Sequence, residues 1–317
     1  MRALSSGFGS ALSLAIGSTL ISCTLVHRER PAPATVWAIA AEALVTIDST
    51  SLRPVLASAA SGKPAGPRGE ARLPQIATVS TYQGSRYHPE TIRSLADDPQ
   101  VMATAAGAIS KAVATVGDGV FLDFQNASPD DLQRLVDISR SIADSARARG
   151  ISPIGIVVPP GDTVSYPTAV LSRAADFIVV RLYGEHRPGT PAGPTSSPEW
   201  ILRQLAMRSV DVGANRLVAE LALFGYLWDS DGGARSVTFA EAQTLVAAES
   251  GSFRRDETSG LLTASGRRGW TVWVPDAQSI VSMVRTVRTT GVNRFALAGA
   301  EGADPEVWVR LGTAIRR

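Results

Sequence analysis

Asp123 and Gln125 are the first residues whose types and spacing suggest chemistry. They end an alternating apolar run that starts at Gly117 and reads as a β-strand, so both side chains point to the same face, one pleat apart. Ser128 and Pro129 follow as the N-cap and the first position of a helix. Proteins of the α/β class hold their chemistry at the carboxyl ends of strands that lead into helices. The segment therefore predicts a polar site at the end of a strand.

Strands and helices alternate along most of the chain. Apolar segments predict these barrel strands: Val36–Ile47, Gln75–Thr81, Gly117–Asn126, Ile151–Val158, Asp176–Tyr183, Arg216–Leu223 and Arg294–Ala298. Such alternation is typical of a parallel sheet with helices outside it, so the fold class is α/β and the expected architecture a (β/α)8 TIM barrel over residues 34–317. Within it, Ser49–Pro74 is expected to be a flexible insertion and Phe253–Val274 a small β excursion.

The N-terminal segment decides whether this barrel has an eighth strand. Residues 3–26 carry no charged side chain and are long enough for a signal peptide or one membrane-spanning helix. The run Leu20–Cys23 resembles a bacterial lipoprotein cleavage box, which makes Cys23 a candidate for lipidation. Alternatively, residues 11–26 supply the first strand and helix of the barrel. We favour export or membrane anchoring through residues 1–33, which places the protein in the cell envelope and leaves the barrel incomplete or irregular at its first strand.

The composition excludes several kinds of partner. The formal net charge is +2, and the scattered basic residues form no stripe with interleaved aromatic residues, so no nucleic-acid surface is expected. Cys23 is the only cysteine, which excludes an intrachain disulfide and a cysteine-based zinc site. The three histidines are far apart in the sequence and lack His-x-x-x-His spacing. We therefore expect no metal and no cofactor.

Five motifs occur in order between Thr35 and the C-terminus. They are Asp118-Gly-Val-Phe-Leu-Asp-Phe-Gln125, Arg181-Leu-Tyr183-Gly184-Glu185-His186, Phe224-Gly225-Tyr226-x-Trp228, Trp273-Val-Pro-Asp276-Ala277 and Asp304-Pro305-x-x-Trp308. This series resembles glycoside hydrolase family 18, the chitinase-like barrels, and above all the branch of bacterial spore-wall hydrolases and domains joined to polysaccharide deacetylases and glycosyltransferases. The first two motifs stand where the family has Asp-Gly-x-Asp-x-Asp-x-Glu and Met-x-Tyr-Asp. The resemblance implies a barrel that binds N-acetylated or other cell-envelope polysaccharides.

The departures from the family pattern fall on its catalytic residues. The family's general acid is a Glu at the position of Gln125, and an amide cannot donate a proton to a leaving oxygen. The substrate's own N-acetyl group is the nucleophile in the family, so the acid is the group that cannot be spared. Four other family residues (Asp, Met, Asp and Trp) are replaced in this chain by Phe121, Arg181, Gly184 and Ala298. The residual site that the resemblance implies is Asp118, Asp123 and Tyr183.

Arg181 is unexpected in an otherwise apolar strand. If its side chain points into the barrel, we expect it to pair with Asp123 or Glu220, which would either plug the sugar site or convert it to bind an anion. Trp228 is a candidate for stacking on a sugar face, although packing is the commoner role of a Trp. The expected substrate-binding residues are Asp123, Gln125, Tyr183, Arg181 and Trp228.

Three functions remain open from the sequence. The first is a non-catalytic chitinase-like barrel that binds polysaccharide, a reading that leans against enzymatic activity. The second is an active glycosidase on chitin- or peptidoglycan-type glycans with a displaced acid such as Glu185, Glu220 or Glu301; Glu42 could in principle supply the acid as well, and nothing in the sequence favours Glu42 or Glu301. The third is a scaffold barrel without a glycan site, which an Arg181–Asp123 pair across the cleft would favour.

Overall fold

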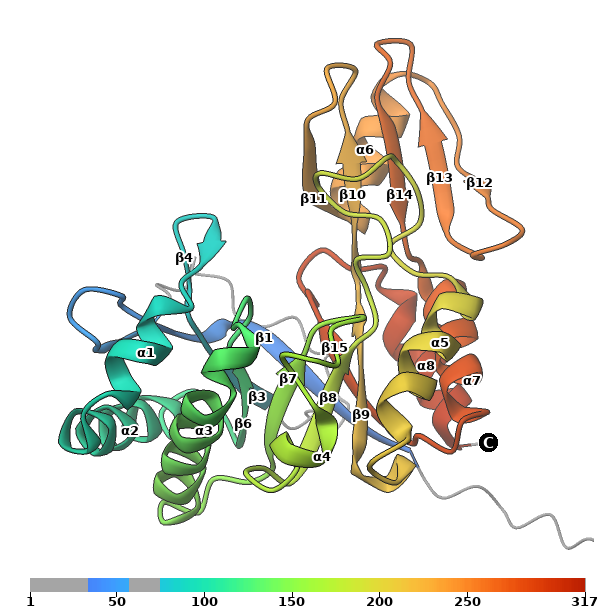
Figure 1. Ribbon diagram of the computed structural model, residues 1–317. Helices are drawn as coiled ribbons and strands as arrows, with labels where there is room; N and C mark the ends of the chain where they lie inside the picture. Colours follow the sequence, from blue (N-terminus) through green and yellow to red (C-terminus); the bar gives the residue numbers. More distant parts are fainter. Residues whose placement is uncertain (1–33, 57–74, 317) are drawn as a thin grey trace, which may run out of the picture. The chain divides into compact units, whose positions relative to one another are not determined.

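Parallel strands close into a barrel in the computed structural model, which describes residues 34–56 and 75–316 (Figure 1). The sheet has the order β15-β9-β8-β7-β6-β3-β1-β2, and β15 also pairs with β1, which closes the ring. Apart from the antiparallel β2 (Pro54–Leu56), the strands of the ring are β1 (Thr35–Ile47), β3 (Gln75–Ser80), β6 (Gly119–Asp123), β7 (Ile154–Val158), β8 (Phe177–Arg181), β9 (Leu217–Ala222) and β15 (Arg294–Ala298). The predicted α/β barrel and its seven strands are confirmed.

The barrel is irregular at its first strand, as expected. The long β1 pairs with β15 through Thr35–Ile39, and its register against β3 shifts between Ile39 and Leu44. Because β1 and β15 pair directly, the ring closes without an eighth strand. Residues 11–26 and Cys23 lie outside the described residues. The expected flexible insertion is corrected in part, because Pro54–Leu56 forms a strand beside Val45–Ile47; residues 57–74 are not among those described.

Each strand of the ring contributes one side chain to a packed layer inside the barrel. The layer consists of Trp37, Ile76, Phe121, Val157, Val179, Val218 and Ala296. The rings of Trp37 and Phe121 meet edge to face with centroids 6.2 Å apart. Gly155 makes room for Phe121, since a Cβ at Gly155 would lie 2.7 Å from that ring. This level of the barrel interior is thus filled with apolar groups, and the polar side chains of Asp123, Arg181 and Glu220 lie toward the carboxyl ends of their strands.

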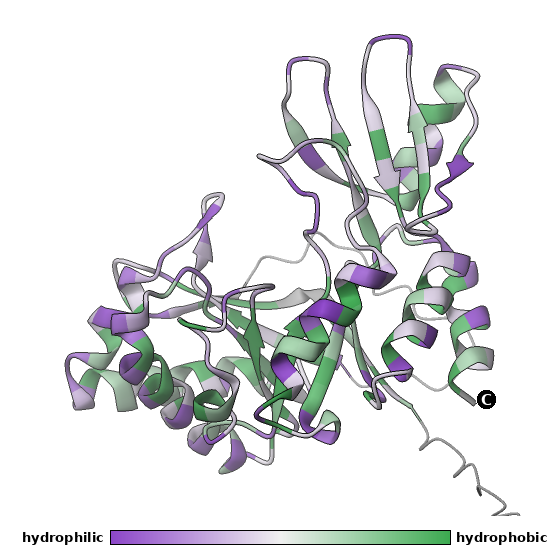
Figure 2. Cartoon of the chain, turned by 45° about the vertical axis from the view of Figure 1, so that its right-hand side comes forward, coloured by the Kyte–Doolittle hydropathy of each residue, from purple (hydrophilic) through white to green (hydrophobic). Residues whose placement is uncertain are grey.

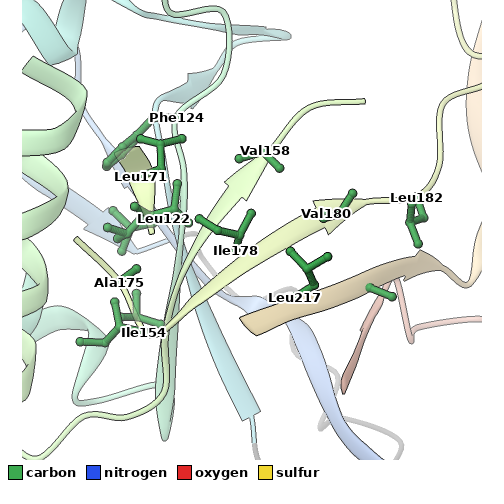
Figure 3. Close-up of a cluster of buried hydrophobic side chains, with 14 of the residues drawn as sticks. Leu122, Phe124, Ile154, Val158, Leu171, Ala175, Ile178, Val180, Leu182 and Leu217 are labelled. Carbon is green, nitrogen blue, oxygen red and sulfur yellow. The ribbon is translucent and has the colours of Figure 1, made fainter. Parts of the chain in front are cut away.

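The helices cover the outside of the strands. Their bounds are α1 (Glu90–Ala96), α2 (Pro99–Val113), α3 (Leu132–Arg147), α4 (Thr168–Leu171), α5 (Pro198–Ser209), α7 (Ala277–Arg288) and α8 (Glu306–Arg316). Outward strand residues such as Leu122, Ile178 and Leu217 pack in the layer between strands and helices (Figure 3). Figure 2 shows the barrel strands mainly in green, and the surrounding helices carry both hydrophobic and hydrophilic residues. Among the residues described, no helix is long and apolar enough to cross a membrane.

The predicted N-terminal boundary of the helix after β6 is close to the observed one. Ser128 begins a single 3-10 turn, Pro129–Asp131, which leads into α3. The side chain of Asp131 accepts hydrogen bonds from the Ser128 hydroxyl at 2.8 Å and from Arg93 Nε and Nη2, each at 2.8 Å. These contacts fix the chain directly after the strand that carries Asp123.

A second sheet is inserted between β9 and β15. Its strands have the order β11-β10-β14-β13-β12, with bounds β10 (Phe224–Trp228), β11 (Ala234–Thr238), β12 (Arg254–Arg255), β13 (Leu262–Ser265) and β14 (Thr271–Val274). The predicted β excursion is confirmed, but it starts earlier, at Phe224. Residues of one face, such as Leu227 and Val272, form a separate core with α6 (Phe239–Ala248). The other face carries the aromatic residues of β10 and Trp273, which pairs with Tyr226 across the strands.

Candidate functional site

Asp123 is the last residue of β6, and its carboxylate is held by three donors. Gln125 Nε2 donates to Oδ1 at 2.6 Å, while Tyr87 Oη and Arg181 Nη2 donate to Oδ2 at 2.7 Å and 3.0 Å. The side chain is 7% exposed. A buried carboxylate requires such partners, because an unpaired charge in a protein interior is costly. The predicted placement of Asp123 and Gln125 on one face is confirmed.

Arg181 ends β8 and contacts two carboxylates at once. Its Nη2 is bonded to Asp123, and its Nε lies 3.7 Å from Glu220 Oε2, so the predicted pairing is confirmed with both partners. Glu220 stands directly beside Arg181 in the register of β8 and β9, which explains the second contact. Burial lowers the pKa of Arg181, but the charge of Asp123, together with Tyr183 and Glu220, outweighs burial and raises it well above its usual value. Arg181 is therefore a fixed positive charge.

Tyr183 and Glu220 form the second half of this network. Tyr183 Oη donates to Glu220 Oε1 at 2.8 Å, whereas Glu220 Oε2 has no hydrogen-bond partner among the described residues. Burial raises the pKa of Glu220, and the charge of Arg181 reduces that rise only in part. Burial likewise raises the pKa of the Tyr183 phenol. Burial thus works against the charged form of each group.

Gln125 is buried and fixed at the position of the expected acid. Its Nε2 also reaches the carbonyl oxygen of Val157 at 3.3 Å. The backbone around it is held by Tyr166, whose Oη donates to the carbonyl of Phe124 at 2.7 Å and accepts from the amide of Ala127 at 2.9 Å. Asn126 between them adopts a φ of 63°, a left-handed conformation that Asn tolerates better than most residues. The amide of Gln125 is therefore a positioned hydrogen-bond donor to Asp123.

Tyr87 is a site residue that the sequence reasoning missed. It lies on the hairpin of β4 (Tyr82–Gln83) and β5 (Arg86–Tyr87), and its ring is 5.0 Å from the ring of Tyr82. Gly84 and Ser85 form the turn with φ values of 62° and 94°. Two residues with positive φ between paired strands are the mark of a tight hairpin. The Gly-Ser turn between two tyrosines was the available signal for the hairpin, but nothing local indicates that Tyr87 reaches Asp123.

Aromatic rings continue from the network along the inserted sheet. Tyr183 and Phe224 meet with centroids 5.5 Å apart, and Phe224 in turn meets Tyr226 at 5.9 Å. Phe224 also covers the end of β15, because a Cβ at Gly299 would lie 2.7 Å from its ring. Phe224 and Tyr226 are half-buried, and Tyr82 is 42% exposed. These rings form an aromatic border at the carboxyl end of the barrel, which is called the mouth below.

Two expected site residues lie elsewhere. Asp118 precedes β6 at the amino end of the strand, opposite Asp123, and its Oδ2 accepts a hydrogen bond from the amide of Gln75 at 3.0 Å. The prediction that Asp118 belongs to the residual site is therefore wrong, because this residue lies at the other end of the barrel. Trp228 is also corrected: it is buried, and its Nε1 donates to the carbonyl of Thr190 at 3.0 Å, so its faces are not available for stacking.

The other candidate acids do not join the network. Glu185 accepts a hydrogen bond from Ser197 Oγ at 3.0 Å, at the start of α5, and Glu301 is exposed on a turn. The side chain of Glu42 is not among those described. No cluster of three or more potential metal ligands occurs in residues 34–56 and 75–316, apart from the few side chains left undescribed there.

Two cavities occur away from Asp123. One of about 240 Å³ lies between α6 and the β13–β14 hairpin, beside Glu249 and Trp270. Another of about 180 Å³ lies at the amino end of β6, beside Gln75 and Asp118. At the carboxyl end, the Asp123 carboxylate is surrounded by Gln125, Tyr87 and Arg181, which donate hydrogen bonds to it.

Comparison with known proteins places this barrel among chitinase-like folds. No protein-family model matches the sequence. A chitinase from Chromobacterium violaceum superposes with a TM-score of 0.70 at 17% identity, over 90% of this chain and 99% of that one. A class V chitinase from Nicotiana tobaccum gives 0.66 at 14% identity, over 89% and 91% of the two chains. The spore cortex-lytic enzyme SleL of Bacillus cereus gives 0.67 at 15% identity, over 76% and 59%. The chain therefore has the chitinase-like fold of glycoside hydrolase family 18.

A curated relative is similar in sequence as well. The chain is 23% identical over 212 residues to an uncharacterized glycosylase, YvbX, of Bacillus subtilis (strain 168). The match covers 62% of this chain and 61% of that protein, so it spans less than two thirds of the relative's length.

Proposed function

We propose that this protein is a chitinase-like domain that binds a cell-envelope polysaccharide without hydrolysing it. The observation that carries this proposal is the network in which Arg181 contacts both Asp123 and Glu220, while Gln125 occupies the position of the acid. Hydrolysis of a glycoside needs a carboxylic acid within reach of the leaving oxygen. Asp123 is bonded to three donors, which leaves it no role as an acid.

A displaced acid is the alternative that would make the domain an active glycosidase. Glu220 is the best placed of the candidates, because burial raises its pKa and so favours the protonated form. However, its side chain is only 4% exposed, and it already accepts a hydrogen bond from Tyr183. A general acid must reach the glycosidic oxygen, so this burial argues against the role.

Glycan binding is supported by the groups that line the mouth. The exposed ring of Tyr82 and the half-buried rings of Phe224 and Tyr226 offer stacking surfaces next to polar groups. Asp123, Gln125, Tyr183 and Arg181 would then act as the floor beneath a bound sugar. A form of the tobacco chitinase with one Glu replaced by Gln has been solved in complex with NAG4, so a Gln-containing variant of that protein retains a glycan.

The decisive experiment measures hydrolysis and binding on the same purified protein. Chitin oligosaccharides and peptidoglycan are incubated with the protein, reducing ends are counted, and binding is measured on a glycan array. We expect binding without turnover. Turnover that Asp123→Ala abolishes would reject the proposal in favour of an active glycosidase. Absence of binding to every glycan would favour a scaffold barrel, a reading that the Arg181–Asp123 contact also supports.

Export or membrane anchoring of the chain is proposed as well. It rests on the charge-free residues 3–26 and on the box that ends at Cys23. Cell fractionation with metabolic labelling by a fatty acid would test it: label that is lost in Cys23→Ser indicates a lipoprotein. Cytoplasmic recovery with an intact N-terminus would contradict it.

A further inference from the structure

We infer that Arg208 of α5 is a positioning residue for the barrel mouth, because it holds Tyr166 against the backbone on both sides of Gln125. This inference rests on the proposed function, since Asp123 and Gln125 are groups that would lie beneath a bound sugar. Arg208 lies on a helix outside the barrel, and its hydrogen bonds go to a loop and not to these two side chains. Its effect on them is therefore expected to pass through Tyr166.

The guanidinium of Arg208 gathers three backbone carbonyl groups. The residue is 1% exposed, and its Nη1 donates to the carbonyl of Tyr166 at 2.6 Å. Its Nη2 donates to the carbonyls of Pro159 and Asp162, each at 2.7 Å. All three carbonyls belong to the loop of residues 159–166, which connects β7 to α4. Because a guanidinium is a planar fork of N–H donors, this one side chain fixes both ends of the loop.

Gln204 holds the same loop from one helical turn earlier. Its Oε1 accepts a hydrogen bond from the amide of Gly161 at 2.8 Å. Gly161 has a φ of 79°, a conformation that glycine adopts without a steric penalty. Residues four apart lie on one face of a helix, so Gln204 and Arg208 act from the same face of α5. This face thus holds the loop through backbone groups of residues 159, 161, 162 and 166.

The charge of Arg208 is buried without a carboxylate bonded to it. Burial lowers the pKa of Arg208 to about 10, and the charge of Asp162 offsets this effect only in part. The Asp162 carboxylate instead accepts hydrogen bonds from the amides of Val164 and Ser165 at 3.1 Å and 2.8 Å. A buried cation costs free energy that an apolar side chain would avoid. The compensating role that we assign to Arg208 is fixation of the loop.

Tyr166 transmits this fixation from the loop to the mouth. Its side chain is buried, and burial raises the pKa of its phenol, so the hydroxyl stays neutral and can donate and accept at once. It donates to the carbonyl of Phe124 and accepts from the amide of Ala127, which flank Gln125. Gln125 in turn donates to Asp123. A looser loop should therefore loosen the Gln125 amide.

Two variants and one matched control test the inference in the full chain. Arg208→Met removes the donors to the loop, and Tyr166→Phe removes only the hydroxyl that reaches the mouth. Arg216→Met is the control, because Arg216 Nη2 also bonds to two backbone carbonyls, those of Ser172 and Ala175, at 2.6 Å and 2.8 Å. These contacts lie at the amino ends of β8 and β9, away from the mouth.

The measurement is the hydrogen exchange rate of the Gln125 side-chain amide by NMR, with its signal assigned by its absence in Gln125→Glu. We expect exchange to accelerate about tenfold in Arg208→Met and Tyr166→Phe, and to stay within about twofold of wild type in Arg216→Met. Calorimetric titration with an N-acetylglucosamine oligosaccharide should show about fivefold weaker binding in the two test variants. Thermal unfolding verifies that the variants are folded, and Arg208→Lys replaces Arg208→Met if the latter is not.

Several outcomes would overturn the inference. Unchanged exchange in both test variants would leave Arg208 with a purely structural role, and acceleration in Tyr166→Phe alone would exclude Arg208 as the positioning residue. Equal acceleration in Arg216→Met would mean that the effect follows a general loss of stability. Faster exchange with wild-type affinity for the oligosaccharide would separate the loop from ligand binding. The exchange rate needs no ligand, so it decides the inference even where the wild type binds no oligosaccharide, a result that rejects the proposed glycan binding instead.

Discussion

Arg181 and Asp123 form an ion pair across a strand that lies between their own strands, with Nη2 and Oδ2 3.0 Å apart. β7 separates β6 from β8, and it contributes no charged side chain to the network. Glu220 on β9 extends the network by one more strand. The ion pair therefore links β6 to β8 above the apolar layer of the barrel. We expect it to stabilise the fold and to affect ligand access to the mouth.

Replacement of Arg181 by Met should destabilise the fold strongly. The variant leaves Asp123 and Glu220 buried without a cation, and loss of one partner of a buried ion pair costs about 3–5 kcal/mol. Urea unfolding monitored by fluorescence measures the change, with Arg140→Gln as a control expected to stay within about 0.5 kcal/mol. The double variant Arg181→Met with Asp123→Asn should recover part of the loss, since it removes the unpaired charge. Wild-type stability in Arg181→Met would contradict the stabilising role of the pair.

Gln125→Glu alone should not create a hydrolase. A carboxylate at this position faces Asp123, whose Oδ1 is 2.6 Å from the present amide nitrogen, and the two like charges repel. The new Glu should therefore take up a proton in the folded state with a raised pKa, so the stability of the variant should fall as the pH rises through that value. Reducing-end assays and unfolding at several pH values measure the two effects.

Activity in the single variant would show that Arg181 does not obstruct the site. The double variant Gln125→Glu with Arg181→Met supplies a carboxyl group at residue 125 and also removes the guanidinium that obstructs the site. Any recovered turnover is therefore expected in this double variant. Full activity of unmodified protein that Gln125→Glu leaves unchanged would instead point to a displaced acid.

The strands and their polar ends could be predicted from sequence, because alternation along β6 and the apolar run of β8 are local patterns. The Arg181–Asp123 contact followed from topology, since the carboxyl ends of parallel strands gather at one edge of a barrel. The contribution of Tyr87 depends on how a short hairpin packs over the mouth, which no local pattern records. The prediction for Trp228 was wrong for a similar reason, because tertiary packing decides whether an aromatic residue faces solvent or a loop carbonyl.

Glu220 should make stability depend on pH above the normal Glu range. Burial raises its pKa in the folded state, so the proton is bound more tightly in the folded than in the unfolded protein. Its contribution is fully present below the unfolded value of about 4.3 and is lost as the pH rises through the folded value. Glu220→Gln keeps an acceptor for Tyr183 but removes the titration. The difference in unfolding free energy between wild type and variant should therefore shift in favour of Glu220→Gln as the pH rises; a constant difference would argue against a raised pKa.

Tyr87→Phe should weaken the network by a defined amount. The phenol donates to Asp123 Oδ2 at 2.7 Å, and its loss leaves a buried carboxylate with two donors in place of three. Hydrogen bonds to charged groups contribute about 1.5–3 kcal/mol, so urea unfolding should show a loss in this range. Tyr82→Phe on the same hairpin is the matched control, because the Tyr82 side chain is exposed and removing its hydroxyl should change stability by less than about 0.5 kcal/mol. Equal effects of the two substitutions would mean that the Tyr87 hydroxyl does not hold Asp123 in solution.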